Sequence, residues 1–285
     1  MKHELTEEWT EVIRPRRSLL DLRLHEVWAY RDLLVMFVRR DFVAGYKQTI
    51  LGPLWFFIQP VFTTLMFTLV FGNIAGISTD GQPKGLFYLA GLTIWNYFSE
   101  CFTRTAGIFT ANAGIFGKVY FPRLITPLSI VVSGLMKFGV QLLLFFAYMG
   151  VYLYAGDPAV RPNSAMLLFP LLVLIMAGFA LGAGMIVSAL TTKYRDLTML
   201  ITFGVTLLMY ATPVIYPVSA VPPAYQVYVQ LNPLSPVVET FRYAFLGSGA
   251  LDWQGLGYSF GTMVILLISG VIIFNKVEQT FMDTV

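Results

Sequence analysis

The hydrophobic pattern of the chain consists of long apolar runs separated by short polar connections. A membrane core of about 30 Å requires about 20 helical residues. Runs of about that length occupy residues 54–74, 86–106, 124–154, 166–190, 197–215 and 255–274. The pattern therefore predicts an all-α integral membrane protein with six transmembrane helices. The third run is too long for one perpendicular span, so we expect it to tilt or to begin in the membrane interface.

The segment 213–252, between the last two spans, differs from the other connections. It is rich in valine, tyrosine and leucine, yet prolines interrupt it at Pro213, Pro217, Pro222, Pro223, Pro233 and Pro236. Proline disrupts a helix interior because it lacks an N–H and its ring collides with the preceding turn. We therefore predict two short re-entrant or interfacial helices here, with any non-helical backbone facing protein or water rather than lipid.

Residues 1–53 form a charged N-terminal segment with a predicted amphipathic helix from Glu26 to Val43. Its apolar face is made by Val27, Tyr30, Leu34, Phe37 and Val38. Asp32 and Arg39 lie opposite that face. A basic amphipathic helix directly before a first span is typical of one that lies in the cytoplasmic membrane interface. The alternative is a solvated helix that docks on the protein itself.

Composition and charge agree with this topology. Apolar residues make up 56% of the 285 positions and charged residues 12%, about half the share in a soluble domain. With six spans, 15 of the 19 lysine and arginine residues fall on the side of the two termini. The opposite connections hold Lys84, Arg161 and Arg242. By the positive-inside rule, both termini are expected in the cytoplasm and segment 213–252 on the outer side.

The sequence contains no recognisable catalytic or metal-binding pattern. The single cysteine, Cys101, excludes an intramolecular disulfide and a CxxC site, and His3 and His25 belong to no metal-ligand cluster. The only Gly-Lys pair, Gly117-Lys118, lacks the upstream glycine of a nucleotide-binding P-loop. We therefore predict no catalytic residue, no metal, no cofactor and no ATP hydrolysis in this chain.

Ionisable residues at membrane depth are candidate functional groups, because burying them there is costly. Glu100 and Arg104 are four apart on the second span and can pair on one helix face. For Lys137 in the third run, the sequence leaves open whether it snorkels, lines an aqueous path or marks the true start of the span. Glu239 and Arg242 are interpreted either as a surface pair or as contacts to an exported ligand.

Two local patterns concern the shape of the predicted spans. Gln59-Pro60 is expected either to interrupt the first span and widen a passage or to form a tolerated kink. Gly178 and Gly182 form a small-xxx-small pair, which permits close packing of two membrane helices.

Aromatic residues account for 15% of the chain, and many lie near the predicted membrane interfaces. Lipid anchoring explains such positions in general. A second interpretation is that some rings line a passage and stack on the apolar faces of sugars. The candidates for this channel lining are Trp55, Phe56, Tyr88, Tyr210 and Tyr216.

Several sequence strings resemble a known family. They are Tyr30-Arg31-Asp32-Leu33-Leu34, Arg39-Arg40-Asp41, Tyr46-Lys47-Gln48-Thr49-Ile50-Leu51-Gly52-Pro53-Leu54-Trp55, Gln59-Pro60, Pro213-Val214-Ile215-Tyr216-Pro217 and Leu231-Asn232-Pro233-Leu234. Through these strings, residues 26–274 resemble the membrane subunits of ABC-2 type polysaccharide exporters, which serve O-antigen, capsule and teichoic acid export. One departure is Gly45, which stands where relatives often carry a basic residue.

The resemblance implies an ABC-2 type transmembrane domain over residues 54–285 and a homodimeric channel in the inner cell membrane. It implies two copies of a separate ATPase subunit, which binds ATP and magnesium, and a lipid-linked glycan as substrate, with no nucleic acid partner. The loop that carries nucleotide-driven motion corresponds to Asn112, Phe116, Lys118, Tyr120 and Arg123. Lipid headgroups or the ATPase are expected at Arg39, Arg40, Tyr46 and Lys47.

The sequence thus favours a permease subunit for a lipid-linked polysaccharide, powered by ATP hydrolysis on a partner chain. Two alternatives remain, an ABC-2 exporter of drugs or small lipids and an ion-coupled transporter. The latter requires several buried carboxylates at mid-span, and only Glu100 is a candidate.

Overall fold

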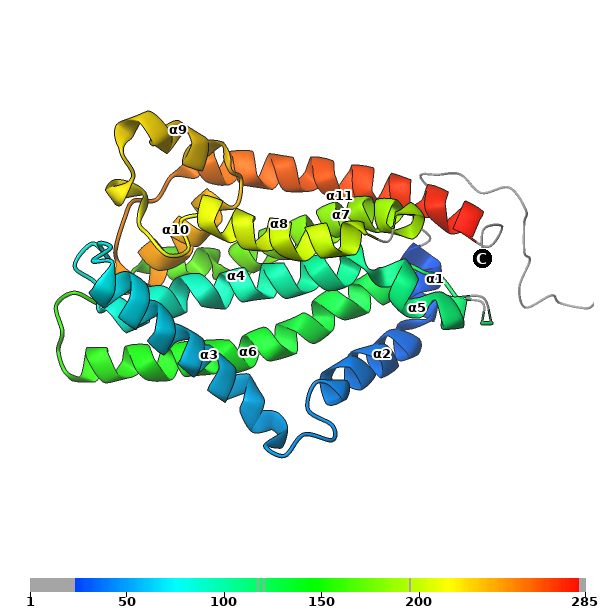
Figure 1. Ribbon diagram of the computed structural model, residues 1–285, viewed down its shortest axis with the longest axis horizontal. Coiled ribbons are helices and arrows are strands. Elements are labelled where there is room, and N and C mark those ends of the chain that lie inside the picture. Colours follow the sequence, from blue (N-terminus) through cyan, green and yellow to red (C-terminus); the bar gives the residue numbers. More distant parts are fainter. Residues whose placement is uncertain (1–23, 117, 120, 195, 282–285) are drawn as a thin grey trace, which may run out of the picture.

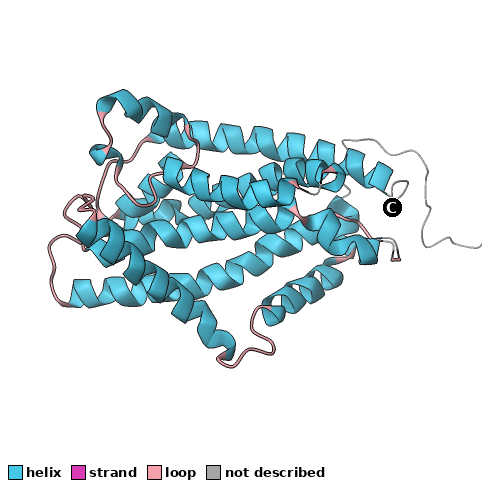
Figure 2. Cartoon of the chain, in the orientation of Figure 1, coloured by secondary structure: helices cyan, strands magenta, loops and turns pink. Residues whose placement is uncertain are grey.

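The structure, a computed structural model, describes residues 24–281 except 117, 120 and 195. Long helices lie along an elongated bundle, and the connections gather at its two ends (Figures 1 and 2). The α-helices are α1 (Leu24–Ala29), α2 (Arg31–Ala44), α3 (Trp55–Phe67), α4 (Lys84–Ala106), α5 (Ile108–Phe116), α6 (Ile125–Tyr154), α7 (Phe169–Lys193), α8 (Leu197–Ala211), α9 (Pro223–Leu231), α10 (Ser235–Leu246) and α11 (Trp253–Phe281). The shorter elements are the 3-10 turns Gly52–Leu54, Ser164–Leu168 and Val218–Ala220 and the π-helix Thr68–Ile74, which extends α3.

Among the described residues, four helical segments are long and apolar enough to cross a membrane. These segments are Gly52–Ile74, Ile125–Tyr154, Ser164–Lys193 and Trp253–Val277. They correspond to the predicted first, third, fourth and sixth spans. Of the other two, α4 is less apolar, and α8 has 15 residues and extends about 22 Å. An all-helical membrane protein is therefore confirmed, while the count of six spans stays a prediction.

Helix α4 forms the centre of the bundle, where it packs against α3, α6, α7 and α10. Every residue from Leu86 to Trp95 is buried. Because protein rather than lipid surrounds this helix, it tolerates polar groups such as Thr93, whose hydroxyl donates to the carbonyl of Leu89 at 2.7 Å. Tyr88 is fully buried beside Phe87, so the prediction that it lines a channel is wrong.

Helices α7 and α11 approach closely through glycines. A Cβ atom added at Gly182 would lie 2.6 Å from the backbone nitrogen of Leu267, and one at Gly270 would lie 2.5 Å from the carbonyl oxygen of Gly182. Gly178 similarly faces Met263 of α11. The close packing expected from the Gly178/Gly182 pair is therefore observed, with α11 as the partner.

The fifth predicted span needs correction, and the structure decides between the two interpretations of Gln59-Pro60 in the first. Helix α3 continues through Pro60, so this pair does not interrupt the span and the proline is tolerated within the helix. Helix α8 ends at Ala211 rather than at residue 215. Thr212 has an extended backbone (φ −100°, ψ 141°), the conformation favoured before a proline such as Pro213. The helix therefore ends where its sequence becomes incompatible with another turn.

Arg242 of α10 holds the unwound chain after α8. Its guanidinium donates to the carbonyl oxygens of Pro213, at 2.6 Å, and Val214, and it lies 3.8 Å from the ring centroid of Phe87. Arg242 is only 2% exposed, so both sequence interpretations, a surface pair and a ligand contact, are wrong for it. Its function here is to satisfy backbone carbonyls that leave the helix.

Glu239, one turn before Arg242, is also turned toward the protein. Its carboxylate accepts a hydrogen bond from the backbone N–H of Val218 at 3.2 Å. Burial raises the pKa of the Glu239 carboxyl, and the nearby Arg242 opposes that rise. The predicted pair of short helices is present as α9 and α10, while their depth in the membrane stays a prediction.

The predicted N-terminal helix is broken at Tyr30 into α1 and α2. Its apolar face packs on the protein, with Phe37 buried and its ring edge-on to Phe121 at 5.7 Å. This face therefore follows the docking interpretation rather than the lipid-facing one. Trp28, Val35 and Met36 lie exposed elsewhere on α1 and α2.

The charge distribution predicted which connections lie together at each end of the helix bundle, and contacts at the two ends agree with it. At the end that carries α9 and α10, the Gln82 amide donates to the carbonyl of Ala159 at 2.8 Å, joining the connections before α4 and α7. At the opposite end, the Thr191 hydroxyl donates to the carbonyl of Ala106 at 2.7 Å, and Phe109 stacks on Phe274 at 4.8 Å. Helix α5 and the C-terminal end of α11 lie there (Figure 1). Which end faces the cytoplasm stays a prediction.

Candidate functional site

A polar cavity of about 670 Å³ opens between α3, α4, α6 and the chain that leads into α3. Its lining residues are Gly45, Trp55, Phe56, Gln59, Pro60, Thr63, Asn96, Ser99, Glu100, Thr103, Arg104, Lys137 and Gln141. Within each helix they recur at intervals of three or four residues, several as adjacent pairs, so each helix presents one face to the cavity. We call this feature the polar cavity.

Sequence analysis identified some of these residues and missed others. The structure brings together residues that were already candidates or open questions, namely Trp55, Phe56, Gln59, Pro60, Glu100, Arg104 and Lys137. The hydroxyl and amide groups on the three helices were missed, namely Thr63, Asn96, Ser99, Thr103 and Gln141. The signal that could have found them is the spacing of isolated polar residues within apolar runs.

A chain of ion pairs forms one wall of the polar cavity. Lys137 pairs with Glu100, and Arg104 lies 3.8 Å from the same carboxylate. The closer partner of Arg104 is Asp41 of α2, at 2.6 Å, and Arg40 pairs with Asp41 at 2.8 Å. The predicted Glu100–Arg104 pair is therefore present, but as part of a network that joins α2, α4 and α6. For Lys137, the structure favours the interpretation that it lines a polar path.

Several polar side chains in the cavity are unpaired. Within the described part of the chain, the side chains of Gln59, Asn96, Ser99 and Gln141 make no hydrogen bond. Gln59 is exposed, and the other three side chains are half-buried. Their polar groups can therefore bond to water or to a polar solute that enters the cavity.

Two aromatic rings flank the amide groups. Trp55 is 44% exposed, and Phe56 packs against Phe42 at a centroid distance of 5.4 Å. The Lys137 ammonium lies 5.8 Å from the Phe56 ring centroid. A Cβ atom at Gly45 would already lie 3.3 Å from Phe56, so the glycine permits this ring to approach the chain before α3.

The four residues predicted to contact lipid headgroups or the ATPase differ in their surroundings. Arg39 and Lys47 are exposed. Arg40 lies over the ring of Phe37 at 4.5 Å while it pairs with Asp41. Tyr46 packs edge-on to Phe56 at 6.1 Å. None of the four predicted residues lines the cavity itself, so a headgroup contact by Arg39 and Lys47 stays a separate prediction.

The proposed nucleotide-driven loop, residues 112–123, contains the second half of α5 and the chain after it. Phe116 is buried in an apolar cluster that includes Met185 of α7 and Phe274 of α11, which anchors the loop to the bundle. The Arg123 guanidinium lies over the Phe116 ring at 5.4 Å. The amide of Asn112 donates to the carbonyl of Ile108 at 2.9 Å, and Lys118 is exposed. Tyr120 lies outside the described residues.

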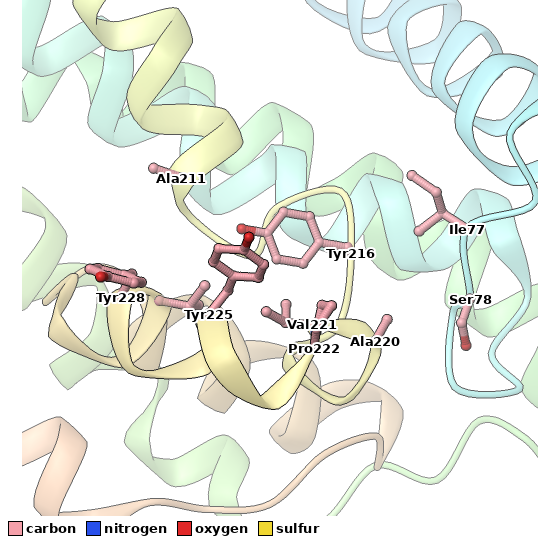
Figure 3. A pocket seen from close by; sticks show the side chains of 10 residues that line it. Ile77, Ser78, Ala211, Tyr216, Ala220, Val221, Pro222, Tyr225 and Tyr228 are labelled. Atoms are coloured by element: carbon pink, nitrogen blue, oxygen red, sulfur yellow. The ribbon is translucent and has the colours of Figure 1, made fainter.

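A second pocket, of about 740 Å³, lies at the end of the bundle that carries α9 (Figure 3). It is mostly apolar and is lined by Ile77, Ser78, Ala211, Tyr216, Ala220, Val221, Pro222, Tyr225, Tyr228 and Val229. The Tyr216 hydroxyl donates to the carbonyl of Tyr210 at 3.0 Å. Tyr216 therefore lines a pocket, whereas Tyr210 contributes only a backbone contact beside it.

Comparison with known proteins identifies the family. Residues 32–246 match the family described as "ABC-2 type transporter". The chain belongs to this family.

Among the described residues, no group of three or more histidine, cysteine, aspartate or glutamate side chains is placed to hold a metal ion.

The relatives of this ABC-2 chain include polysaccharide permeases. It is 28% identical to the O-antigen export system permease protein RfbA of Klebsiella pneumoniae over 88% of this chain and 94% of that protein. It is 29% identical to RfbA of Myxococcus xanthus over 92% and 98%. It is 23% identical to the polysialic acid transport protein KpsM of Escherichia coli over 86% and 93%. The family resemblance is therefore confirmed, and the chain is a multi-pass inner-membrane protein.

Proposed function

We propose that this chain is the channel-forming permease subunit of an exporter that moves a lipid-linked polysaccharide across the inner membrane. Two copies of the chain form the channel. Two separate ATPase subunits, which bind ATP and magnesium, supply the energy. This chain contributes the passage and the motion of its helices, and it forms no covalent bond with the substrate.

The polar cavity is the observation that carries the proposal. Sugars present many hydroxyl groups, and the unpaired amides of Gln59, Asn96 and Gln141 can both donate to and accept from them. The exposed ring of Trp55 offers a flat apolar surface for the C–H face of a pyranose. The names of the relatives, O-antigen and polysialic acid permeases, support the same class of substrate.

The surfaces outside the cavity support the proposed assembly. Helices α3 and α8 expose large apolar side chains, such as Phe62 and Phe203, which suit lipid or a second copy of the chain. At the end of the bundle beside α5, Ile115, Lys118 and Val119 are exposed. Phe116 is buried at the end of α5, and the residues that follow it are exposed. Such a fixed but accessible helix end suits a contact with an ATPase subunit.

The cavity also bears on the two alternatives. An exporter of drugs or small lipids is expected to have a mainly apolar passage, whereas this cavity carries amides and hydroxyls. An ion-coupled transporter is expected to hold a carboxylate free to bind and release its ion. Glu100 is instead shared between Lys137 and Arg104. Both features favour the polysaccharide exporter.

A deletion and complementation experiment tests this function. Deleting the gene for the chain is expected to abolish surface glycan while lipid-linked glycan accumulates inside the cell. Restoring the chain restores export, but only with an ATPase partner whose P-loop lysine is intact. Copurification of the two subunits checks the assembly. Unchanged surface glycan in the deletion strain contradicts the proposal.

A further inference from the structure

Positive charge exceeds negative charge in the ion-pair network at the wall of the polar cavity. Among the described residues, this network joins three cations, Arg40, Arg104 and Lys137, to two carboxylates. Asp41 is shared by Arg40, at 2.8 Å, and Arg104, at 2.6 Å, while Glu100 pairs with Lys137. The two cations that line the cavity, Arg104 and Lys137, have side chains that are 32% and 21% exposed. The network thus has one more cation than it has carboxylates.

Both lining cations keep hydrogen-bond donors that can meet an anion. The Arg104 nitrogen Nη1 lies 3.8 Å from Glu100 and 3.4 Å from the Ser133 hydroxyl, and both contacts are long for a hydrogen bond. The Lys137 ammonium carries three N–H groups, and Glu100 accepts a hydrogen bond from it. An anionic oxygen atom can therefore receive hydrogen bonds from both side chains without breaking the pair of Arg104 with Asp41.

The charged part of the cavity lies near the ends of the helices that form it. Arg104 is in the last turn of α4, and Trp55 is the first residue of α3. Asp41 belongs to α2, which precedes the first predicted span. Tryptophan and basic side chains near the ends of membrane helices are typical of the interface, where the phosphate groups of lipids lie. The position of these charges therefore favours a lipid phosphate as their ligand.

Apolar side chains beside the cavity suit the hydrocarbon part of such a lipid. Phe57 of α3 is exposed and follows the lining residue Phe56 in sequence. Met136 of α6 is exposed and precedes the lining residue Lys137. Consecutive helical residues point in directions about 100° apart, so these apolar side chains border the lining faces. Two walls of the cavity thus offer polar contacts to a headgroup and apolar contacts to its chain.

We propose that the polar cavity binds the phosphate group of a lipid, with Arg104 and Lys137 as its cationic ligands. Two lipids share this chemistry, the carrier lipid of an exported glycan and an anionic phospholipid of the membrane. For the carrier lipid, the inference rests on the proposed function and places the junction between lipid and glycan at the cavity. Glu100 competes with the phosphate for Lys137 and thereby weakens phosphate binding.

Lipids with and without a phosphate test this site. The purified full-length chain in dodecyl maltoside, a detergent without phosphate, is titrated with polyprenyl phosphate, polyprenol, phosphatidylglycerol or diacylglycerol. Native mass spectrometry measures the fraction of protein that carries each lipid. We expect at least one phosphate-bearing lipid to bind about tenfold more tightly than its neutral counterpart, because only the phosphate forms charge-assisted hydrogen bonds. This difference is expected to shrink as the salt concentration rises.

Two substitutions in one ion pair separate a ligand from a merely structural residue. Lys137→Gln removes a phosphate ligand and is expected to weaken binding of the phosphate-bearing lipid about tenfold. Glu100→Gln removes the competing carboxylate and is expected to strengthen that binding by about the same factor. Loss of a structural ion pair would instead change both affinities in the same direction. Lys193→Gln, at an exposed position at the end of α7 and outside the cavity, is expected to leave the affinity unchanged.

The outcomes separate this inference from the proposed function. If phosphate-bearing lipids bind no more tightly than neutral ones, or if Lys137→Gln and Glu100→Gln shift the affinity in the same direction, the phosphate site is overturned while glycan export stands. Tighter binding of polyprenyl phosphate than of phosphatidylglycerol identifies the carrier lipid as the ligand, and equal or weaker binding identifies the phospholipid; both results support the site. If deletion of the chain leaves surface glycan unchanged, the proposed function fails, while the titration still decides the phosphate site.

Discussion

At the scale of single residues, the ion-pair network shows what the sequence could and could not predict. Glu100 and Arg104 were paired correctly from their spacing, because residues four apart share one helix face. The closer partner of Arg104 is Asp41, which is 63 residues away in the chain. The partner of Lys137 lies on another helix as well. Such contacts depend on how helices pack, which spacing within one helix does not reveal.

Asp41→Asn tests the link between α2 and the cavity wall. The variant keeps the side-chain shape but removes the charge that holds Arg104 at 2.6 Å. The free energy of unfolding is expected to fall by about 1–3 kcal/mol, since a mostly buried, charge-assisted hydrogen bond is lost. Denaturant titration of the protein in detergent measures the change, with exposed Asp32→Asn as the control. Equal stability of both variants would show that the link contributes nothing.

Tyr88→Phe tests the correction made for that residue. Within the described chain, the Tyr88 hydroxyl is buried without a hydrogen-bond partner. Removing it is expected to leave export unchanged and to alter the unfolding free energy by at most about 1 kcal/mol. Tyr88→Ala, which also removes the ring from the core, is expected to cost about 3–5 kcal/mol. A strong loss of export in a stable Tyr88→Phe protein would restore the channel-lining interpretation.

At the scale of helices, the length of the apolar runs predicted most of the architecture, because a helix must be long and apolar to cross a membrane. The long third run is one helix of 30 residues, Ile125–Tyr154, as its length implied. Errors occurred where protein contacts replace lipid. The end of α8 is set by Pro213 and by Arg242, which satisfies the following carbonyls. The apolar face of α2 packs on protein, which hydropathy alone cannot distinguish from packing on lipid.

Two glycines on α11 provide a matched test of helix packing. A Cβ atom at Gly270 would meet the Gly182 carbonyl at 2.5 Å, whereas one at Gly261 meets nothing within 4 Å. Gly270→Ala is expected to separate α7 from α11 and to lower stability by about 1–3 kcal/mol, an overpacking cost. Gly261→Ala is expected to be neutral or stabilising by up to about 1 kcal/mol. Thermal unfolding in detergent compares the two, and equal midpoints would contradict the packing.

At the scale of the whole molecule, the fold turns scattered polar positions into one site. Gln59, Asn96 and Gln141 come from three different helices and are isolated in sequence. Each could be explained singly as a tolerated polar residue, and only the packing of α3, α4 and α6 places them around one cavity. The family and its general topology were thus predictable from sequence strings, while the cavity was not. The central claim is that a glycan passes through it.

Export by cavity variants measures that claim directly. Gln141→Leu and Asn96→Leu replace amides with apolar groups of similar size, and each leaves sugar hydroxyls without partners. Surface glycan, measured at equal membrane levels of the permease, is expected to fall about tenfold in both, because an unmet polar contact costs about 1–3 kcal/mol. Gln254→Leu, an equal change at an exposed position on α11 outside the cavity, is expected to export normally. Normal export by all three variants would contradict passage of the glycan through the cavity.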